Sequence, residues 1–334
     1  MARITIDHIN LAGISTVVPA NIEYNRDLLL NDQEKNVLIK TTGIESRRIA
    51  NSTITAADLC IRAAQKLMAE LKWVPDEIEI IVFVSQTPDH TIPGSSMFMQ
   101  HQLGLSKQCI ALDVNQGCAG YVYGLSVIAS MMQSGKLNKG LLLVGDTLSK
   151  VIDKKDSSLV PIFSDAGSCT AIESGTGSMD FHLQTDGSGF EHIIVKNGGA
   201  RDPEGDQGYL YMNGQDVFNF ALQEVVPNVE SLLSSAKVKA DEIDYLVMHQ
   251  ANILLNESIR KKLKMEESKT LYSLKEYGNT SCATIPVSIS ANAEKLVNKK
   301  DVQFLLVGFG VGLSWGSALV KSNKTTFLPI DEFR

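Results

Sequence analysis

Residues 76–82 read DEIEIIV, and residues 241–247 read DEIDYLV, a similar stretch 165 positions later. A second pair follows in the same order, with LLVG at residues 142–145 and again at 305–308. Two matches separated by almost half of a 334-residue chain indicate a duplicated unit, because solenoid repeats have much shorter periods. We therefore predict two similar halves, residues 1–175 and 176–334.

An amphipathic helix pattern lies before each DEI stretch, and a short apolar run begins within the stretch. Leu59, Ala63, Leu67 and Leu71 are spaced by four, and Val217–Leu233 shows the same pattern. Five apolar runs are too short for helices and are predicted to be strands buried on both faces: Ile80–Val84, Ile110–Val114, Leu141–Val144, Leu246–Met248 and Phe304–Val307. Helices that alternate with such strands predict a layered α/β fold with right-handed βαβ connections. The stretch 184–210, rich in Gly, Asp and Asn, is predicted to form an exposed loop or hairpin.

Composition and charge exclude several classes of protein. The chain is 44% hydrophobic and 21% charged, as is typical of a globular protein. Its net charge of −7 argues against binding to nucleic acids or anionic membranes. The chain start lacks the features of a signal peptide, and no apolar run approaches about 18 residues, so we expect a cytoplasmic protein without membrane insertion. The five cysteines lack metal-site spacing, which predicts reduced thiols and no metal site.

Cys118 lies where a strand gives way to a helix. It follows the strand 109–114 and a turn-like Asn-Gln-Gly, and it precedes an apolar helix expected to end near Gly135. The free N–H groups and the dipole at a helix N-terminus favour a thiolate, so we expect the pKa of the Cys118 thiol to lie below its usual value of about 8.5. A small buried residue at a tight turn would account for the same sequence equally well.

Two further polar residues follow predicted strands or turns in the second half. His249 ends the strand 245–248, and the ends of strands are where α/β sites collect. Asn279 lies in a glycine-containing turn before a helix predicted over Ile285–Lys295. The 163-residue offset carries Cys118 onto Ser281, so the Asn279 loop is the counterpart of the Cys118 loop and the two are expected to face each other. Taken singly, His249 is better explained as a hydrogen-bonded histidine at a strand end, and Asn279 as part of an ordinary turn.

Four motifs together resemble the β-ketoacyl-acyl carrier protein synthase III family of the thiolase fold. They are CAGY from Cys118, HQAN from His249, GNTS around Asn279, and GFGVGLSWG at residues 308–316. The resemblance extends from Thr42 to Val320, and it implies a homodimer with a five-layered αβαβα fold made of two duplicated halves.

The resemblance also implies a reaction. Cys118 would take an acyl group from acyl-acyl carrier protein or acyl-coenzyme A, without a permanently bound cofactor. Malonyl-acyl carrier protein would then lose carbon dioxide and attack the acyl-cysteine. A neutral His249 with a proton on Nε2, together with the Asn279 amide, would stabilise the enolate, and the backbone N–H groups of Cys118 and Val311 would form the oxyanion hole. In an alternative function, His249 would act as a general base and the acyl group would pass to an alcohol or amine. A binding protein with vestigial site residues is a third class.

Several positions depart from the family pattern or point to partners. Val311 stands where the family has glycine, and Val37 and Ser157 stand where it has the Trp and Arg that clamp coenzyme A. By the same resemblance, Ile92 would stand at the dimer-contact position that closes the partner's acyl pocket, or would serve interface packing alone. Four cations follow the His249 segment and are expected to dock the acidic carrier protein or to close a helix C-terminus: Arg260, Lys261, Lys262 and Lys264.

Overall fold

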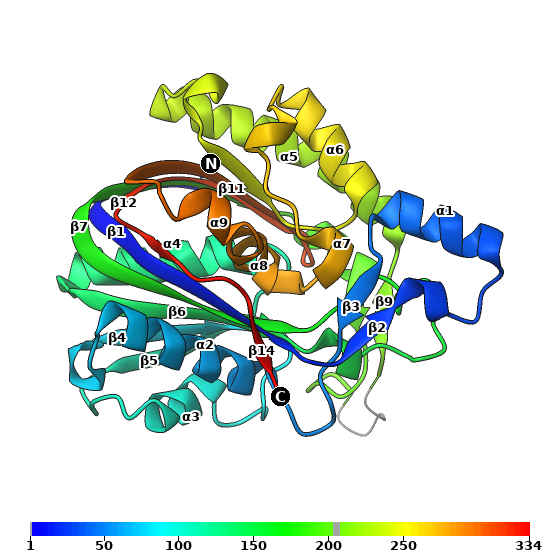
Figure 1. Cartoon of the computed structure of the whole chain (residues 1–334), viewed down its shortest axis with the longest axis horizontal. Helices are drawn as coiled ribbons and strands as arrows, with labels where there is room; N and C mark the ends of the chain where they lie inside the picture. The colour runs from blue at the N-terminus through cyan, green and yellow to red at the C-terminus, as the bar shows by residue number, and fades with distance from the viewer. Residues whose placement is uncertain (1, 203–207) are drawn as a thin grey trace.

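Helices and sheet alternate in five layers (Figure 1) in the computed structural model, which describes residues 2–202 and 208–334. One outer layer holds α2 (Ala56–Leu71) and α3 (Ser95–Gln102), and the other holds α5 (Gly214–Ala236) and α6 (Ile253–Lys262). Between them lie two layers of strands, β4 (Ile80–Val84), β5 (Ile110–Val114) and β6 (Lys139–Asp146) in one and β10 (Tyr245–Met248), β11 (Asp301–Gly310) and β12 (Ser314–Asn323) in the other. Helices α4 (Gly120–Gly135) and α8 (Thr284–Ala291) form the middle layer, so the expected αβαβα arrangement is confirmed.

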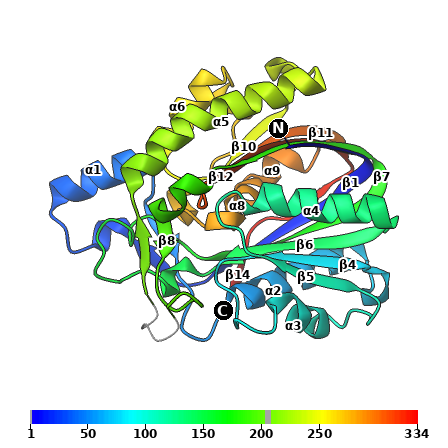
Figure 2. The ribbon, with the colours of Figure 1, turned by 180° about the vertical axis from the view of Figure 1, so that it is seen from behind.

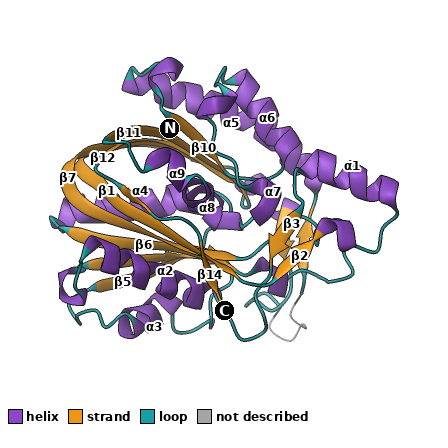
Figure 3. Ribbon diagram, viewed as in Figure 1, coloured by secondary structure: helices purple, strands orange, loops and turns teal. Residues whose placement is uncertain are grey.

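Two long strands join the two layers of sheet, as Figure 3 shows in orange. Strand β7 (Ala166–Thr185) pairs with β6 through residues 166–173 and with β12 through residues 178–185. Strand β1 (Ala2–Pro19) runs antiparallel beside β7. The boundary predicted between residues 175 and 176 falls inside β7, and the division into halves remains a prediction.

The repeated sequence stretches have the same local structure. A 3₁₀ turn precedes β4 at Pro75–Glu77 and precedes β10 at Ala240–Glu242. In each case the glutamate of the turn accepts a hydrogen bond from the backbone N–H three residues before it, at 3.0 Å for Glu77 and 2.7 Å for Glu242. Equal local geometry at equivalent places supports the interpretation of the sequence repeat as a duplication.

Among the described residues, three large apolar clusters lie between the layers, and a smaller fourth one contains Leu148, Ile152, Leu159 and Phe163. The largest surrounds α4 and α8, where Tyr121, Leu125 and Ile289 are fully buried. The other two large clusters lie between α2 and its sheet and between α5, α6 and theirs. Helix α4 is apolar on nearly all sides because both sheets pack against it, as Figure 2 shows from behind.

Smaller elements complete the fold. Two short antiparallel pairs occur, β2 (Ile22–Tyr24) with β3 (Ser46–Arg48), and β8 (Ile193–Val195) with β9 (Leu210–Met212). The second pair agrees with the loop or hairpin predicted at 184–210, although β9 extends beyond that stretch to Met212 and residues 203–207 lie outside the described part. Others are α1 (Asp32–Thr42), α7 (Leu274–Tyr277), α9 (Ala293–Leu296), β13 (Thr326–Phe327) and β14 (Asp331–Phe333). Across the described ranges, no helix has the length and apolarity needed to cross a membrane.

Two expectations about individual elements are wrong. Strand β5 is not buried on both faces, since Ile110 is 41% exposed, because β5 is the last strand of the sheet and has a neighbour on one side only. The helix predicted over Ile285–Lys295 is interrupted at Asn292, which separates α8 from α9. The side chain of Asn292 donates to the carbonyls of Ser288 and Tyr272, and such local hydrogen bonds compete with helix continuation.

Candidate active site

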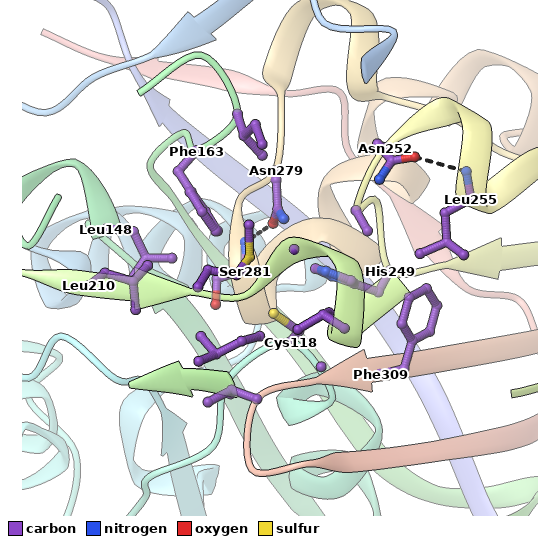
Figure 4. A pocket seen from close by; sticks show the side chains of 18 of the residues that line it. Cys118, Leu148, Phe163, Leu210, His249, Asn252, Leu255, Asn279, Ser281 and Phe309 are labelled. Atoms are coloured by element: carbon purple, nitrogen blue, oxygen red, sulfur yellow. Dashed lines mark hydrogen bonds between the residues drawn. The ribbon is translucent and has the colours of Figure 1, made fainter. Parts of the chain in front are cut away.

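A cavity of about 180 Å³ lies where the loops after β5 and β10 meet the turn before α8 (Figure 4). Cys118, His249 and Asn279 all line it, although they come from three distant parts of the chain. The rest of its wall is mainly apolar and includes Leu148, Ile162, Phe163, Ile193, Leu210, Met212, Val217, Phe218, Leu255 and Phe309. Such a lining suits an apolar chain that ends at a few polar groups.

Cys118 is presented to the cavity by a tight turn. Helix α4 has Ala119 as its N-cap, so Cys118 lies just outside the helix rather than in its first turn. The Gly120 N–H donates to the Gly117 carbonyl at 2.6 Å, which bends the chain sharply at the sulfur. A side chain on Gly310 would lie 2.9 Å from the Cys118 sulfur and within 2.6 Å of its Cβ. Glycine at position 310 is therefore what lets strand β11 approach Cys118 so closely.

The expectation of a lowered pKa at Cys118 is wrong. Desolvation raises the pKa of this thiol to about 11 and outweighs hydrogen bonds from the backbone N–H groups of Val311 and Cys118 and from the Ser281 side chain. The negative charge of Asp146 acts in the same direction as desolvation. The thiol is therefore protonated at neutral pH, and its reaction with a thioester needs a base.

His249 follows β10 directly, and its ring is buried against α8. Its backbone N–H donates to the Val307 carbonyl at 2.7 Å, and its own carbonyl accepts from the Asn256 side chain at 3.0 Å. The ring contacts Phe309 edge to face, with 5.4 Å between centroids. Its Nδ1 lies 2.8 Å from the Thr284 hydroxyl. Burial lowers the pKa of His249 to about 3, so the imidazole is neutral at physiological pH.

Asn279 is fixed at both its backbone and its side chain. Its backbone N–H donates to the Ile162 carbonyl and its carbonyl accepts from the Ser164 N–H, each at 2.9 Å. Its side-chain Oδ1 accepts from the Ser281 N–H at 2.9 Å, drawn as a dashed line in Figure 4. The amide oxygen is thereby occupied, and the NH₂ group is left for the cavity.

The cations predicted for docking are not equivalent. Arg260 is bound by Glu257 through two hydrogen bonds of 2.9 and 2.6 Å and also donates to the Met265 carbonyl, which leaves its side chain only 12% exposed. Arg260 therefore does not share the exposed surface of Lys261, Lys262 and Lys264. Helix α6 ends at Lys262, so Lys264 lies beyond the helix in a left-handed conformation. The spacing of Glu257 and Arg260 could have indicated this ion pair from the sequence.

The remaining predicted positions lie outside the cavity. Ile92 is 85% exposed in the loop before α3, and it lines a neighbouring, more polar pocket that shares Gln86 with the cavity. Val37 on α1 and Ser157 are both exposed. Neither offers an aromatic face or a guanidinium to a nucleotide.

The structure adds residues that the sequence patterns did not indicate. Thr284 and Ser281 contact His249 or Asn279, but a serine or threonine near a helix start is common and carries no specific signal. In the described ranges, no three His, Cys, Asp or Glu side chains are grouped so that they could hold a metal ion.

Comparisons with known proteins identify the family. The model for 3-oxoacyl-[acyl-carrier-protein] synthase III matches residues 112–187, and the model for its C-terminal part matches residues 233–322. The β-ketoacyl-[acyl-carrier-protein] synthase III of Caldanaerobacter subterraneus is 31% identical over 94% of this chain and 98% of its own length. The enzyme of Lactococcus lactis is 32% identical over 93% and 98%.

A solved structure agrees with the sequence comparisons. The 3-oxoacyl-(acyl-carrier protein) synthase of Burkholderia xenovorans superposes with a TM-score of 0.94 at 33% identity, over 99% of both chains. Fold, family models and full-length relatives lead to the same assignment. This chain belongs to the 3-oxoacyl-[acyl-carrier-protein] synthase III family, acyltransferases of the thiolase-like fold.

Proposed function

We propose that this protein is a β-ketoacyl-acyl carrier protein synthase III that carries an acyl group on Cys118 and condenses it with malonyl-acyl carrier protein, in fatty-acid initiation or in a specialised lipid or polyketide pathway. The observation that supports this most directly is the meeting of Cys118, His249 and Asn279 in one cavity. The names of the similar enzymes agree with it.

The first half-reaction transfers the acyl group. The Cys118 sulfur attacks the thioester carbonyl of the donor, a new carbon–sulfur bond forms, and the donor leaves as a thiol. The backbone N–H groups of Cys118 and Val311 both face the sulfur, so they are placed to hold the oxyanion of the tetrahedral intermediate. Valine at 311 supplies its backbone N–H as well as glycine would.

The second half-reaction forms the carbon–carbon bond. Malonyl thioester loses carbon dioxide, and the electron pair of the broken bond passes into an enolate whose oxygen needs a hydrogen-bond donor. The NH₂ group of Asn279 is free for this because Ser281 holds the amide oxygen. The enolate carbon then attacks the acyl-cysteine, and the Cys118 thiolate leaves.

The donor is expected to arrive on a carrier protein. With Val37 and Ser157 at the clamp positions, the adenine of coenzyme A lacks stacking and a guanidinium contact, a loss of at least about 1.4 kcal/mol or roughly tenfold in affinity. Exposed Lys261, Lys262 and Lys264 offer an acidic carrier protein a docking surface that does not depend on adenine.

Intact-protein mass spectrometry tests the function. The protein is incubated with one acyl chain on acyl carrier protein and on coenzyme A, and malonyl-acyl carrier protein is then added. We expect an acyl adduct on Cys118, formed faster from the carrier, and then release of carbon dioxide and a β-ketoacyl product. A Cys118→Ala variant should form no adduct. Absence of the wild-type adduct would reject the proposal, and transfer of the acyl group to an alcohol or amine without decarboxylation would support the alternative function instead.

A further inference from the structure

Gln86 is a polar residue of the cavity wall that takes no part in the proposed reaction. It follows β4 directly, and its side chain is exposed on a wall that is otherwise mainly apolar. The other described polar residues of this wall already act in the reaction, lie beside the Cys118 sulfur or cap a helix: Cys118, His249, Asn252, Asn279 and Ser281. A polar group placed in this way is suited to recognise a polar group of the ligand.

The backbone of Gln86 is fixed by a buried acidic side chain. Its N–H donates to Oδ1 of Asp146 at 2.7 Å, and the Ser85 hydroxyl donates to the same oxygen at 3.0 Å. Asp146 is the last residue of β6 and is fully buried. These bonds tie the loop after β4 to the end of β6, so the side chain of Gln86 starts from a defined position.

The side-chain amide of Gln86 is turned so that its oxygen faces the backbone just before Cys118. Its Nε2 donates to Oδ1 of Asn115 at 3.4 Å. A Cβ atom on Gly117 would clash with Oε1 of Gln86 and with Cγ1 of Val311, so glycine at this position lets both side chains lie against the chain beside the nucleophile. Within the described ranges, no side chain or backbone group donates to Oε1, which leaves an acceptor open toward the cavity.

Gln86 lies on the side of the cavity where we expect the acyl chain. The carrier protein is proposed to dock at the end of α6, and Leu255 of the same helix lines the cavity. Gln86 instead borders a second pocket, which Thr147, the neighbour of Leu148, also lines. Figure 4 shows Leu148 on one side of Cys118 and Leu255 on the other. A carrier arm that enters beside α6 therefore directs its acyl group toward Leu148 and Gln86.

We propose that Gln86 is a specificity-determining residue whose Oε1 accepts a hydrogen bond from a hydroxyl group of the acyl chain, so that this enzyme selects hydroxyacyl thioesters. The inference rests on the proposed function and names the substrate class of the same site. Because Oε1 lies beside the residue before Cys118, the hydroxyl group belongs on one of the first carbons after the thioester. An unsubstituted chain would displace water from Oε1 without replacing its hydrogen bond, which disfavours that chain.

Competition between donors tests the selectivity. Butyryl, 2-hydroxybutyryl and 3-hydroxybutyryl groups are loaded onto acyl carrier protein, and each hydroxyacyl donor is mixed with an equal amount of the butyryl donor. Intact-protein mass spectrometry then counts the two Cys118 adducts, which differ by one oxygen atom. In the wild type we expect at least one hydroxyacyl adduct to exceed the butyryl adduct roughly three- to tenfold, the range of one net hydrogen bond.

Variants separate recognition from reactivity, because a nearby hydroxyl group also makes a thioester carbonyl more electrophilic. Gln86→Met and Gln86→Leu both remove the amide oxygen, and we expect the adduct ratio to fall by the same factor in each. Gln116→Met is the matched control, since Gln116 lies in the turn before Cys118 but is not among the described residues that line the cavity. It should keep the wild-type ratio.

The outcomes distinguish this inference from the proposed function. Unchanged ratios in the Gln86 variants, an equal fall in Gln116→Met, or a wild type that favours butyryl over both hydroxyacyl donors would overturn the inference, while the butyryl adduct would still support the proposed function. Absence of every Cys118 adduct would reject the proposed function and the inference with it.

Discussion

Burial affects Cys118 and His249 in the same sense, because it disfavours the charged form of each. It raises the pKa of the thiol to about 11 and lowers the pKa of the imidazole to about 3. The resting pair is therefore neutral, unlike the thiolate and imidazolium pairs of cysteine proteases. A neutral pair avoids placing two charges in an apolar cavity before the substrate arrives.

Alkylation by iodoacetamide reports this state of Cys118. We expect Cys118 to be labelled before the other thiols, because Cys60, Cys169 and Cys282 are buried and Cys109 does not line the cavity that Cys118 shares with His249. Below a pKa of about 11 the thiolate fraction rises tenfold per pH unit, so the labelling rate should keep rising from pH 7 to pH 9. Peptide mapping over this range provides the measurement. A plateau near pH 7, or earlier labelling of Cys109, would contradict the assignment.

Replacement of Asn279 by Asp separates the two half-reactions. A carboxylate can still accept from the Ser281 N–H, so the loop should keep its shape, but it repels the enolate and lacks the NH₂ donor. Loss of such a donor costs about 10²–10³ in rate. We expect decarboxylation to fall by this factor while acylation of Cys118 persists. Asn252→Asp is the matched control in the same cavity, because Asp also caps a helix and can accept from the Leu255 N–H.

At the residue scale, the sequence patterns predicted which residues meet in the site, but not the surroundings that determine their pKa values. The positions of Cys118, His249 and Asn279 at strand ends and turns predicted that they would face one cavity. The pKa of Cys118 could not be predicted, because it depends on the end of β11 and on Ser281, more than 160 positions away in the chain. The contact of Thr284 with His249 has no sequence signal, because the two residues are 35 positions apart and meet only in the fold.

At the scale of elements, the end of helix α6 determines which cations are free. Arg260 is used to fasten the helix to Glu257 and to the Met265 carbonyl, whereas Lys261 and Lys264 extend from the last turn and the residues beyond it. The two interpretations of this basic segment, closing a helix C-terminus and docking an acidic carrier protein, thus apply to different residues. Alternation of helix and strand was predictable from apolar periodicity, but the break at Asn292 was not, because it depends on a contact with the Tyr272 carbonyl.

Charge reversal at Lys264 tests the docking surface. Lys264→Glu should slow acylation from acyl carrier protein by up to about fivefold at low salt, the equivalent of about 1 kcal/mol for an exposed ion pair. The effect should shrink as salt rises. Lys72→Glu is the control, since Lys72 has the same φ of 56° at the end of α2, in the opposite outer layer. An equal effect of both substitutions would mean that net charge alone matters.

At the scale of the whole molecule, one edge of the sheet is left exposed. Strand β5 ends the sheet, and α3 beside it exposes Met97 and Phe98, while Ile92 lies in the loop just before it. An open strand edge flanked by apolar side chains is typical of a surface that another chain covers. The exposed edge also explains why the prediction of burial was wrong for Ile110. The apolar pattern of β5 is that of a strand with a neighbour on each side, but a single chain places only β4 beside it.

We therefore predict that the protein is a homodimer joined through β5 and α3, with Ile92 directed toward the second copy. Ile110→Lys should shift the protein from dimer to monomer, because a lysine on an edge strand opposes pairing with another strand and the substituted position is exposed enough for the chain to fold. Val297→Lys is the control, since Val297 is an exposed apolar residue after α9, away from this edge. Analytical ultracentrifugation at micromolar concentration should give twice the mass of one chain for the wild type and for the control, and the mass of one chain for Ile110→Lys. A monomeric wild type, or a dimer that Ile110→Lys leaves intact, would place the interface elsewhere.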